Sequence, residues 1–331
     1  MINIEQGVLF QHKLLSRLVR WLLPIIFICL QSTLTNATPE KVNSDNIILI
    51  YSPDSRFQST IAQDLTTQIN HSLDNIRITK ISPSDFGNNN ELNTGLVIAI
   101  GFDSINHADI SFKNNDKLLI SSDPDEYQVS KNIDIEQAVL YMSQSYCKKI
   151  QLINNINKQW NTFSYLDNKI KPVNNKKITH CANQYGLTAN RVGTTQDGNL
   201  SQDIKKALKN SDLLLALPNK AIYNSKSVKN ILLTSYRKRK PVIGFSNNFV
   251  KAGALASIHS NPEQITSSIY NLIKQYYENN NHFKKTINYP EEFDISINKQ
   301  VFRALNLTIP DIEILKKSLT AKSNTLPGES K

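Results

Sequence analysis

The sequence holds few residue patterns that could support catalysis or bind a metal. Gly193 and Gly198 have the spacing of a phosphate-binding loop, but Asn199 and Leu200 stand where that loop needs Lys and then Ser or Thr. We therefore interpret this segment as an ordinary loop. No G-x-G-x-x-G, H-E-x-x-H, C-x-x-C or G-x-S-x-G pattern occurs. The sequence predicts no catalytic residue, no metal ligand and no cofactor, so we expect a protein that is not an enzyme.

Polar and aromatic side chains that follow expected strands are instead candidates for binding a small ligand. Ligands of open α/β sheets sit beyond the carboxyl ends of the strands, and facing polar groups with an aromatic ring or two can grip a small polar molecule. The candidates are Ser52, Ser55, Phe102, Asp103, Ser122 and Asp123 in the first half, and Asp167, Thr195, Asn219, Tyr223 and Ser246 in the second. Several also have a purely structural interpretation. Asp123 would open a turn, Ser55 and Ser246 would cap helices, and Phe102 would belong to the core.

Short apolar runs alternate with helical patterns, which is typical of repeated βα units on a parallel sheet. We expect strands at 46–51, 76–81, 95–101, 117–121, 161–166, 189–193, 212–217, 241–245, 254–258 and 293–297. Helical patterns cover 55–73, 134–157, 173–185, 200–208, 227–236 and 262–277, and a short one ends near residue 305. The series starts again after residue 157, which indicates a second lobe.

The N-terminal segment predicts export. Three basic residues precede an apolar run at 21–30, and small and polar residues follow up to Ala37, in the order of a secretory signal peptide. The run is shorter than the roughly 17–25 residues that span a bilayer. We expect cleavage near Ala37 and a periplasmic protein. An uncleaved anchor, or a lipid on Cys29, is the alternative, and an uncleaved anchor would leave the soluble part unchanged.

Loss of 37 of the 331 residues leaves 294, enough for one large or two medium α/β domains. The formal net charge is +10, and the leader carries +2 of it. Arg237–Lys240 forms the one basic run, at the end of an expected helix, where cations complement the helix dipole. No aromatic residues interleave with this run, so we expect no nucleic-acid partner.

Two cysteines follow the leader, Cys147 and Cys181, and both fall in helical patterns. They could pair in an oxidising compartment, but the sequence does not give their separation. A disulfide and two small buried apolar residues therefore both remain open.

An ordered set of segments resembles the ABC-transporter substrate-binding proteins, in particular the family whose better-known members bind tryptophan or tyrosine. The segments are Asp212–Asn219, Tyr223-Asn224, Ile231–Arg237, Pro241–Ser246, Val250–Leu255, Tyr289-Pro290, Phe293–Asn298 and Ala304–Pro310. Ser121–Pro124 and Tyr51-Ser52 are weaker matches in the first half.

The resemblance implies a type I periplasmic-binding fold. This is an α/β fold of two doubly wound parallel-sheet lobes joined by three crossovers, with ligand in the cleft between them. We expect the crossovers near 157–161, 246–253 and 288–293. Lobe 1 would comprise 45–158 plus 247–289, so that the strand at 254–258 returns to it, and lobe 2 would comprise 159–246 plus 290–315. The polar tail at 319–331 would be disordered.

The same resemblance implies a solute-binding protein with two partners, a small polar ligand and an ABC permease, and we expect a monomer. In many relatives Asp follows the Leu-Pro pair of the second lobe and suits a ligand ammonium. Here Asn219 follows it, which favours a neutral or anionic ligand over an amino acid. A periplasmic sensor subunit that presents its bound state to a membrane receptor or histidine kinase is the alternative function. A catalytic role is the third, although no motif supplies a nucleophile or an acid–base pair.

Overall fold

The computed structural model describes residues 46–73, 76–85, 95–122, 136–169, 172–194 and 199–321. The expected signal peptide, Asp123 and Thr195 lie outside these ranges. Among the described residues, no helix has both the length and the apolar character needed to cross a bilayer.

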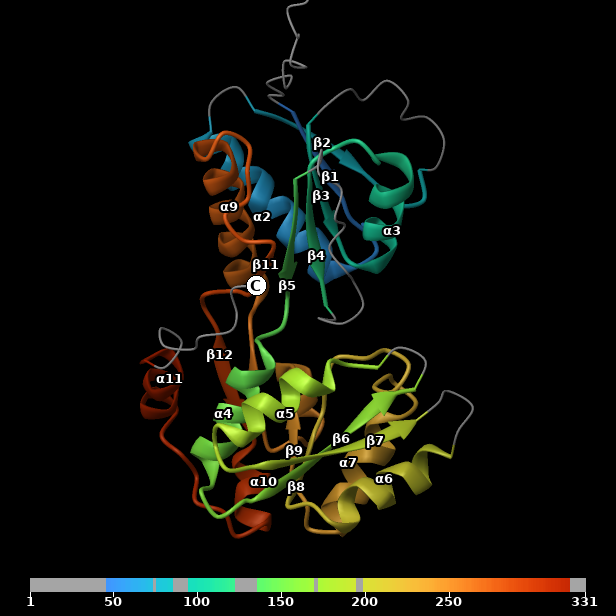
Figure 1. The fold of residues 1–331 in the computed structure, drawn as a ribbon, viewed down its shortest axis with the longest axis vertical. Coiled ribbons are helices and arrows are strands. Elements are labelled where there is room, and N and C mark those ends of the chain that lie inside the picture. Colours follow the sequence, from blue (N-terminus) through green and yellow to red (C-terminus); the bar gives the residue numbers. More distant parts are fainter. Residues whose placement is uncertain are drawn as a thin grey trace, which may run out of the picture. The chain divides into compact units, whose positions relative to one another are not determined.

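The first sheet consists of six parallel strands (Figure 1). In spatial order they are β2 (Arg77–Ile81), β1 (Asn46–Ile50), β3 (Leu96–Ile100), β4 (Lys117–Ser121), β5 (Gln137–Tyr141) and β11 (Ile287–Asn288). Alternate residues of β1 face opposite cores, with Ile47 and Leu49 in one and Ile48 and Ile50 in the other. Both faces are therefore covered, which is why these strands are continuous apolar runs.

The second sheet repeats the pattern with one antiparallel edge strand. Its order is β7 (Thr188–Thr194), β6 (Thr162–Asn168), β8 (Leu213–Leu215), β9 (Val242–Gly244), β10 (Ala256–His259) and β12 (Asp294–Ile297). Only the β10–β12 pair is antiparallel. Within β8, Leu213 and Leu215 face one core and Leu214 faces the other.

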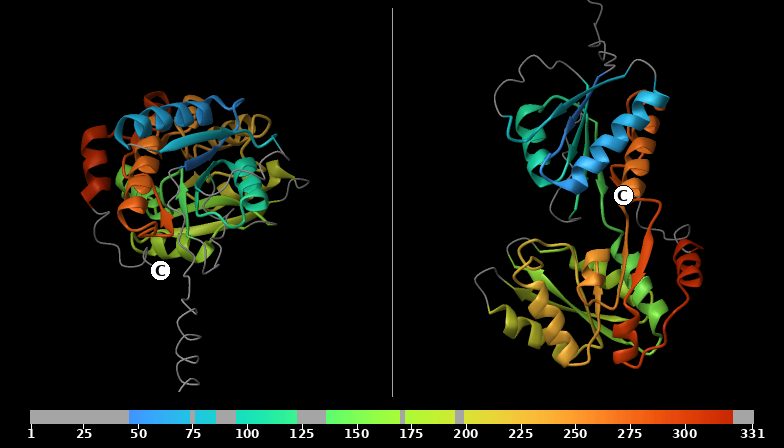
Figure 2. Two further views of the ribbon diagram at one scale, coloured as in Figure 1. Left: turned by 90° about the horizontal axis from the view of Figure 1, so that it is seen from above. Right: turned by 180° about the vertical axis from the view of Figure 1, so that it is seen from behind.

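Helices cover both faces of the first sheet. On one face α2 (Arg56–Ser72) and α9 (Pro262–Glu278) pack against each other, as the view from behind shows (Figure 2). On the other face lies α3 (Phe102–Ser111). The start of α9 is strongly specified, because Asn261 and Gln264 form a capping box around Pro262 in the first turn.

The second sheet separates two helix layers with distinct cores. One layer holds α4 (Tyr146–Ile156), α5 (Asn175–Asn183), α10 (Lys299–Ala304) and α11 (Ile312–Ala321). The other holds α6 (Leu200–Lys209), α7 (Val228–Arg237) and α8 (Asn247–Lys251). Cys147 on α4 and Cys181 on α5 form a disulfide with Cα atoms 4.9 Å apart, which decides the question that the sequence left open.

Three segments carry the chain between the two sheets: β5 to α4, β10 to α9, and β11 to β12. This confirms the predicted fold class of two doubly wound lobes with three crossovers. The third link lies where we expected it.

Two predictions that involve strands are wrong. The single helix expected at 134–157 begins in fact with β5, and α4 starts only at Tyr146. The apolar run at 138–141 is too short for hydrophobic periodicity to distinguish a strand from a helix. It forms a strand because it pairs with β4. The strand expected to return to the first lobe is β10, which pairs with β9 and β12 in the second sheet. The links expected near 157–161 and 246–253 are therefore misplaced.

Four short elements escaped the sequence analysis: α3, α8, α11 and β11. The tail expected to be disordered from residue 319 is helical as far as Ala321, because α11 packs Leu315 and Leu319 into the core of the second sheet.

Candidate functional site

A cavity of about 430 Å³ lies where strand ends of both sheets meet the crossovers. Its lining follows six strands at their carboxyl ends, the edge where ligands of open α/β sheets bind. The lining residues are Phe57, Ser122, Met142, Ser143, Pro218, Phe245, Ser246, Asn247, Asn248, His259, Ser260, Asn261 and Pro262.

On the side of the second sheet, the turn after β9 supplies four consecutive lining residues. Ser246 caps α8 by accepting a hydrogen bond from the Phe249 backbone N–H at 3.2 Å, so the chain turns sharply and leaves Asn247 and Asn248 exposed. The turn needs Gly244 in the strand before it, since a Cβ there would come within 2.9 Å of the Phe249 Cβ. Phe245 is held by edge-on contact with the ring of Tyr223, at a centroid distance of 5.8 Å.

His259 ends β10 and brings a titratable group to the cavity. Its Nδ1 lies 3.1 Å from the Ser257 hydroxyl. Burial lowers the pKa of His259 below its usual 6.5, although the negative charge of Asp294 partly opposes this. The imidazole is therefore uncharged at neutral pH.

The first sheet contributes an aromatic ring and small polar groups. Phe57 lies in the first turn of α2, and 40% of its side chain is exposed. The loop before it is fixed by Gln58, whose Oε1 accepts a hydrogen bond from the Ser52 backbone N–H at 2.8 Å. Ser122 follows β4, and Met142 and Ser143 follow β5.

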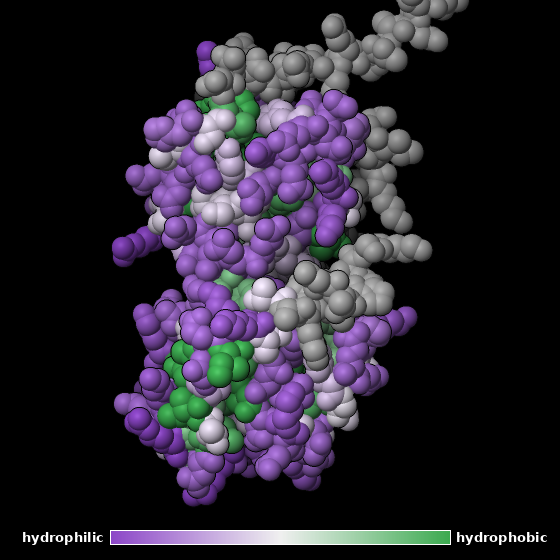
Figure 3. Space-filling model, turned by 90° about the vertical axis from the view of Figure 1, so that its left-hand side faces the viewer, coloured by the Kyte–Doolittle hydropathy of each residue, from purple (hydrophilic) through white to green (hydrophobic). Residues whose placement is uncertain are grey.

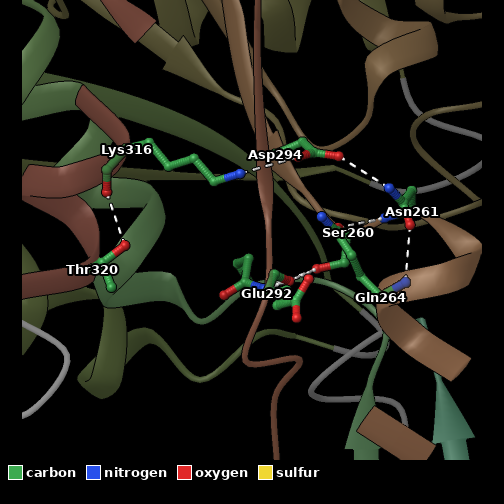
Figure 4. Close-up of polar contacts among 8 residues, drawn as sticks. Ser260, Asn261, Gln264, Glu292, Asp294, Lys316 and Thr320 are labelled. Atoms are coloured by element: carbon green, nitrogen blue, oxygen red, sulfur yellow. Dashed lines mark hydrogen bonds and ion pairs between the residues drawn. The ribbon is translucent and has the colours of Figure 1, made fainter. Parts of the chain in front are cut away.

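The three crossovers are joined by hydrogen bonds beside the cavity. Gln144, fully buried in the first crossover, donates from Nε2 to Ser260 Oγ and to the Pro290 carbonyl, each at 3.0 Å. Ser260 in turn donates to the Glu292 carbonyl at 2.8 Å (Figure 4). Cavity residues and crossovers thus form one connected group.

A second set of contacts continues from Asn261 into the second sheet (Figure 4). Asn261 Nδ2 donates to Asp294 Oδ2 at 3.1 Å, and Lys316 on α11 lies 3.4 Å from Asp294 Oδ1. This fixes the N-terminus of α9, where the chain leaves β10 for the first sheet.

The described lining holds no Asp, Glu, Lys or Arg. Two aromatic rings, Met142 and two prolines supply apolar surface, while serine hydroxyls, asparagine amides and a neutral imidazole supply donors and acceptors. Such a mixture suits an uncharged polar molecule with an apolar or flat face. The described residues also contain no group of three or more His, Cys, Asp or Glu that could hold a metal.

Of the residues predicted from the sequence, the structure brings Ser122 and Ser246 to the cavity. Ser246 is at the same time a helix cap, and Ser55 caps α2 by accepting from the Gln58 backbone N–H. Ser52 lies in the same loop as Ser55.

The other described candidates lie outside the lining. Phe102 and Asp103 are exposed in the first turn of α3. Asp167 is buried and binds Arg191 Nε at 2.5 Å and the Val173 backbone N–H at 3.0 Å.

Asn219 and Tyr223 belong to the loop after β8. Asn219 Oδ1 accepts from the Ala221 backbone N–H at 3.1 Å. Tyr223 packs edge-on against both Phe245 and Phe249, and burial raises the pKa of its hydroxyl. Direct ligand contact by these residues, and by Asp123 and Thr195, stays a prediction.

Sequence reasoning missed most of the lining, although the strand-end rule contained part of it. Phe245 follows β9 directly and could have been selected beside Ser246. His259 and Ser260 directly follow the strand expected at 254–258, and the same rule could have selected them. Met142 and Ser143 were overlooked because β5 was taken for helix. Phe57 and Asn248 carry no signal that the sequence alone reveals.

No protein-family model matches this sequence, and no curated protein matches it. Solved structures share its fold. The ABC domain from Streptococcus pneumonia in complex with L-Trp is 14% identical with a TM-score of 0.56, over 82% of this chain and 98% of that one. The ligand-free, open form of a substrate binding protein with adhesive properties from Clostridium difficile is 17% identical with a TM-score of 0.59, over 81% and 97%.

A periplasmic ribose ABC transporter protein from Conexibacter woesei is 9% identical with a TM-score of 0.50, over 80% of this chain and 95% of that one. At such identities the similarity concerns the fold. Together with the strand orders and the three crossovers, it identifies the architecture as the type I periplasmic-binding fold.

Proposed function

We propose that this chain is a solute-binding protein that captures a small, uncharged polar molecule in the cavity described above. The observation that carries the proposal is the composition of that cavity: strand ends of both sheets and two crossovers meet there, and the described lining carries no formal charge. A charged ligand buried there would lose its hydration without gaining an ion pair from these residues.

The crossovers support capture by hinge closure. A ligand that contacts both lobes binds a closed arrangement of the lobes more tightly than an open one. The difference between the two affinities sets how far the ligand shifts the protein toward the closed state. Because Gln144 and Ser260 link crossovers beside the cavity, ligand contacts with Ser143 or Ser260 act directly on the hinge segments. This arrangement performs binding and release, and no catalytic step is part of the proposal.

Export is part of the proposal. The basic and apolar order of the first 37 residues favours secretion, and the Cys147–Cys181 disulfide is stable in an oxidising compartment. A periplasmic binding protein would then deliver its ligand to an ABC permease, and the names of two structurally similar proteins contain an ABC domain and a periplasmic ribose ABC transporter.

A thermal-shift screen tests the proposal. We would measure the melting temperature of the full chain with sugars, nucleosides, free amino acids and small anions, because a ligand that binds only the folded state raises it by mass action. We expect hits among the uncharged polar compounds. Hits confined to charged compounds would contradict the proposed ligand class, and the absence of any concentration-dependent shift would contradict small-molecule capture.

A further inference from the structure

The positive charge of the chain is concentrated in one segment of the sequence. Residues 199–253 contain eleven Lys and Arg and only two carboxylates, Asp203 and Asp212, so this segment alone accounts for +9 of the formal +10. It contains α6, α7 and α8, which share one core on the same face of the second sheet. Six of the eleven cations lie on these three helices, and the other five lie in the loops on either side of α7.

The cations of this layer have few electrostatic partners. Lys205, Lys206 and Lys209 are exposed on α6, as are Lys229 and Arg237 on α7. None of the ion pairs found among the described residues includes a cation from 199–253. Burial raises the pKa of Asp212, hydrogen bonds from Asn161 and Thr162 lower it below its usual value, and Lys240 adds only a weaker attraction. Such a field favours an anionic partner and speeds its association.

An apolar groove of about 580 Å³ runs along α7 within this layer. We call it the α7 groove. Val228, Leu232, Leu233 and Tyr236 line it from α7, while Gly253 follows α8 and Val301 belongs to α10. Leu233 and Tyr236 remain 42% and 53% exposed. The half of the molecule with the second sheet also shows gathered apolar side chains surrounded by hydrophilic ones on the face drawn in Figure 3.

We propose that the α7 groove binds an acidic polypeptide segment whose apolar side chains fill it. The positive charge of the layer favours a partner with carboxylates. Lys229 lines the groove itself and could pair with a carboxylate next to the apolar side chains of the peptide. A flat lipid surface fits less well, because the apolar residues line a groove. The groove shares no lining residue with the ligand cavity, so the two sites are separate.

The test uses a synthetic peptide with Glu on one face and Leu at i, i+3, i+4 and i+7 on the other, about 18 residues or roughly five helical turns long. A scrambled peptide of identical composition serves as the matched control. Titration of the full chain by fluorescence anisotropy should give tighter binding for the amphipathic peptide than for the scrambled one. Leu233→Ser should weaken binding about tenfold, because the variant loses the apolar surface that Leu233 would bury against the peptide.

Charge and location need their own controls. Lys229→Glu should weaken binding strongly at low salt and less at high salt, since salt screens exposed charges. Ile314→Ser changes an apolar side chain that is 69% exposed on α11, and Lys113→Glu changes an exposed cation beside the first sheet; both should leave the affinity unchanged. Unchanged thermal melting of each variant would exclude misfolding.

Two results would overturn the proposal. The amphipathic and scrambled peptides could bind with equal affinity, and Leu233→Ser could leave that affinity unchanged. Binding would then result from charge attraction alone, without the groove. Binding to phosphatidylglycerol vesicles that is stronger than binding to the peptide, and that Leu233→Ser abolishes, would assign the surface to membranes instead.

Discussion

Gln144 Nε2 lies 3.0 Å from Ser260 Oγ, so a side chain of the first crossover holds the second, 116 residues further along the chain. The same amide reaches the carbonyl of Pro290 in the third. One buried residue therefore connects all the segments about which the two lobes would move.

Gln144→Ala should lower the free energy of unfolding by about 1–3 kcal/mol, because it leaves the Pro290 carbonyl without this donor in a buried site. Urea denaturation measures the change. Gln63→Ala, at an exposed position of α2, is the matched control and should stay within about 0.5 kcal/mol of the wild type. Equal stability of the two variants would show that the Gln144 contacts do not hold the crossovers together.

Two phenylalanines with equal exposure allow a sharp test of the cavity. Phe57 and Phe102 are each 40% exposed and each begin a helix after a strand of the first sheet, but only Phe57 lines the cavity. Phe57→Ala should weaken binding of a screening hit about tenfold or more through lost aromatic contact. Phe102→Ala should have little effect. Calorimetric titration measures the ligand affinity of both variants. A larger loss of affinity in Phe102→Ala than in Phe57→Ala would favour the site predicted from the sequence.

The disulfide should stabilise the second lobe through the chain that it closes. Cys147 and Cys181 are separated by 34 positions, and a loop of this length corresponds to roughly 3–4 kcal/mol of loop-closure entropy. Dithiothreitol should therefore lower the urea midpoint of the wild type. The Cys147→Ala/Cys181→Ala variant should start from the lower value and not respond to the reductant. A response of that variant would mean that the reductant acts elsewhere.

The lowered pKa of His259 predicts how part of the free energy of unfolding changes with pH. Since its folded pKa lies below 6.5, the unfolded state takes up a proton more readily. The contribution of His259 to the free energy of unfolding is therefore fully present above pH 6.5, and it is lost as the pH falls toward the folded-state pKa. His259→Gln should flatten the change in unfolding free energy between about pH 7.5 and about pH 5.5. An unchanged slope in His259→Gln would contradict the assignment.

The sequence was informative where local pattern determines structure. Continuous apolar runs such as Ile47–Ile50 predicted strands covered on both faces, and both faces are indeed covered. Helices with a capping residue and an apolar face, such as α2 and α9, were placed to within a few residues.

The failures share a different cause. The position of β10 depends on pairing with β9 and with the distant β12, and no local signal records that choice. The candidate site also lacked the residues after β10, although the strand-end rule applies to that strand in either lobe. Ser122 and Ser246 were found because they follow strands that were expected at the right place. Phe57 has the helical spacing of the apolar face of α2, which predicts a core residue, yet its side chain is 40% exposed.

The most direct test of the central claim is a crystal structure of the full chain with a ligand from the screen. The account predicts density for the ligand in the cavity, against Phe57, Phe245 and His259, without a compensating ion. Density at another site, with this cavity filled only by water, would contradict it.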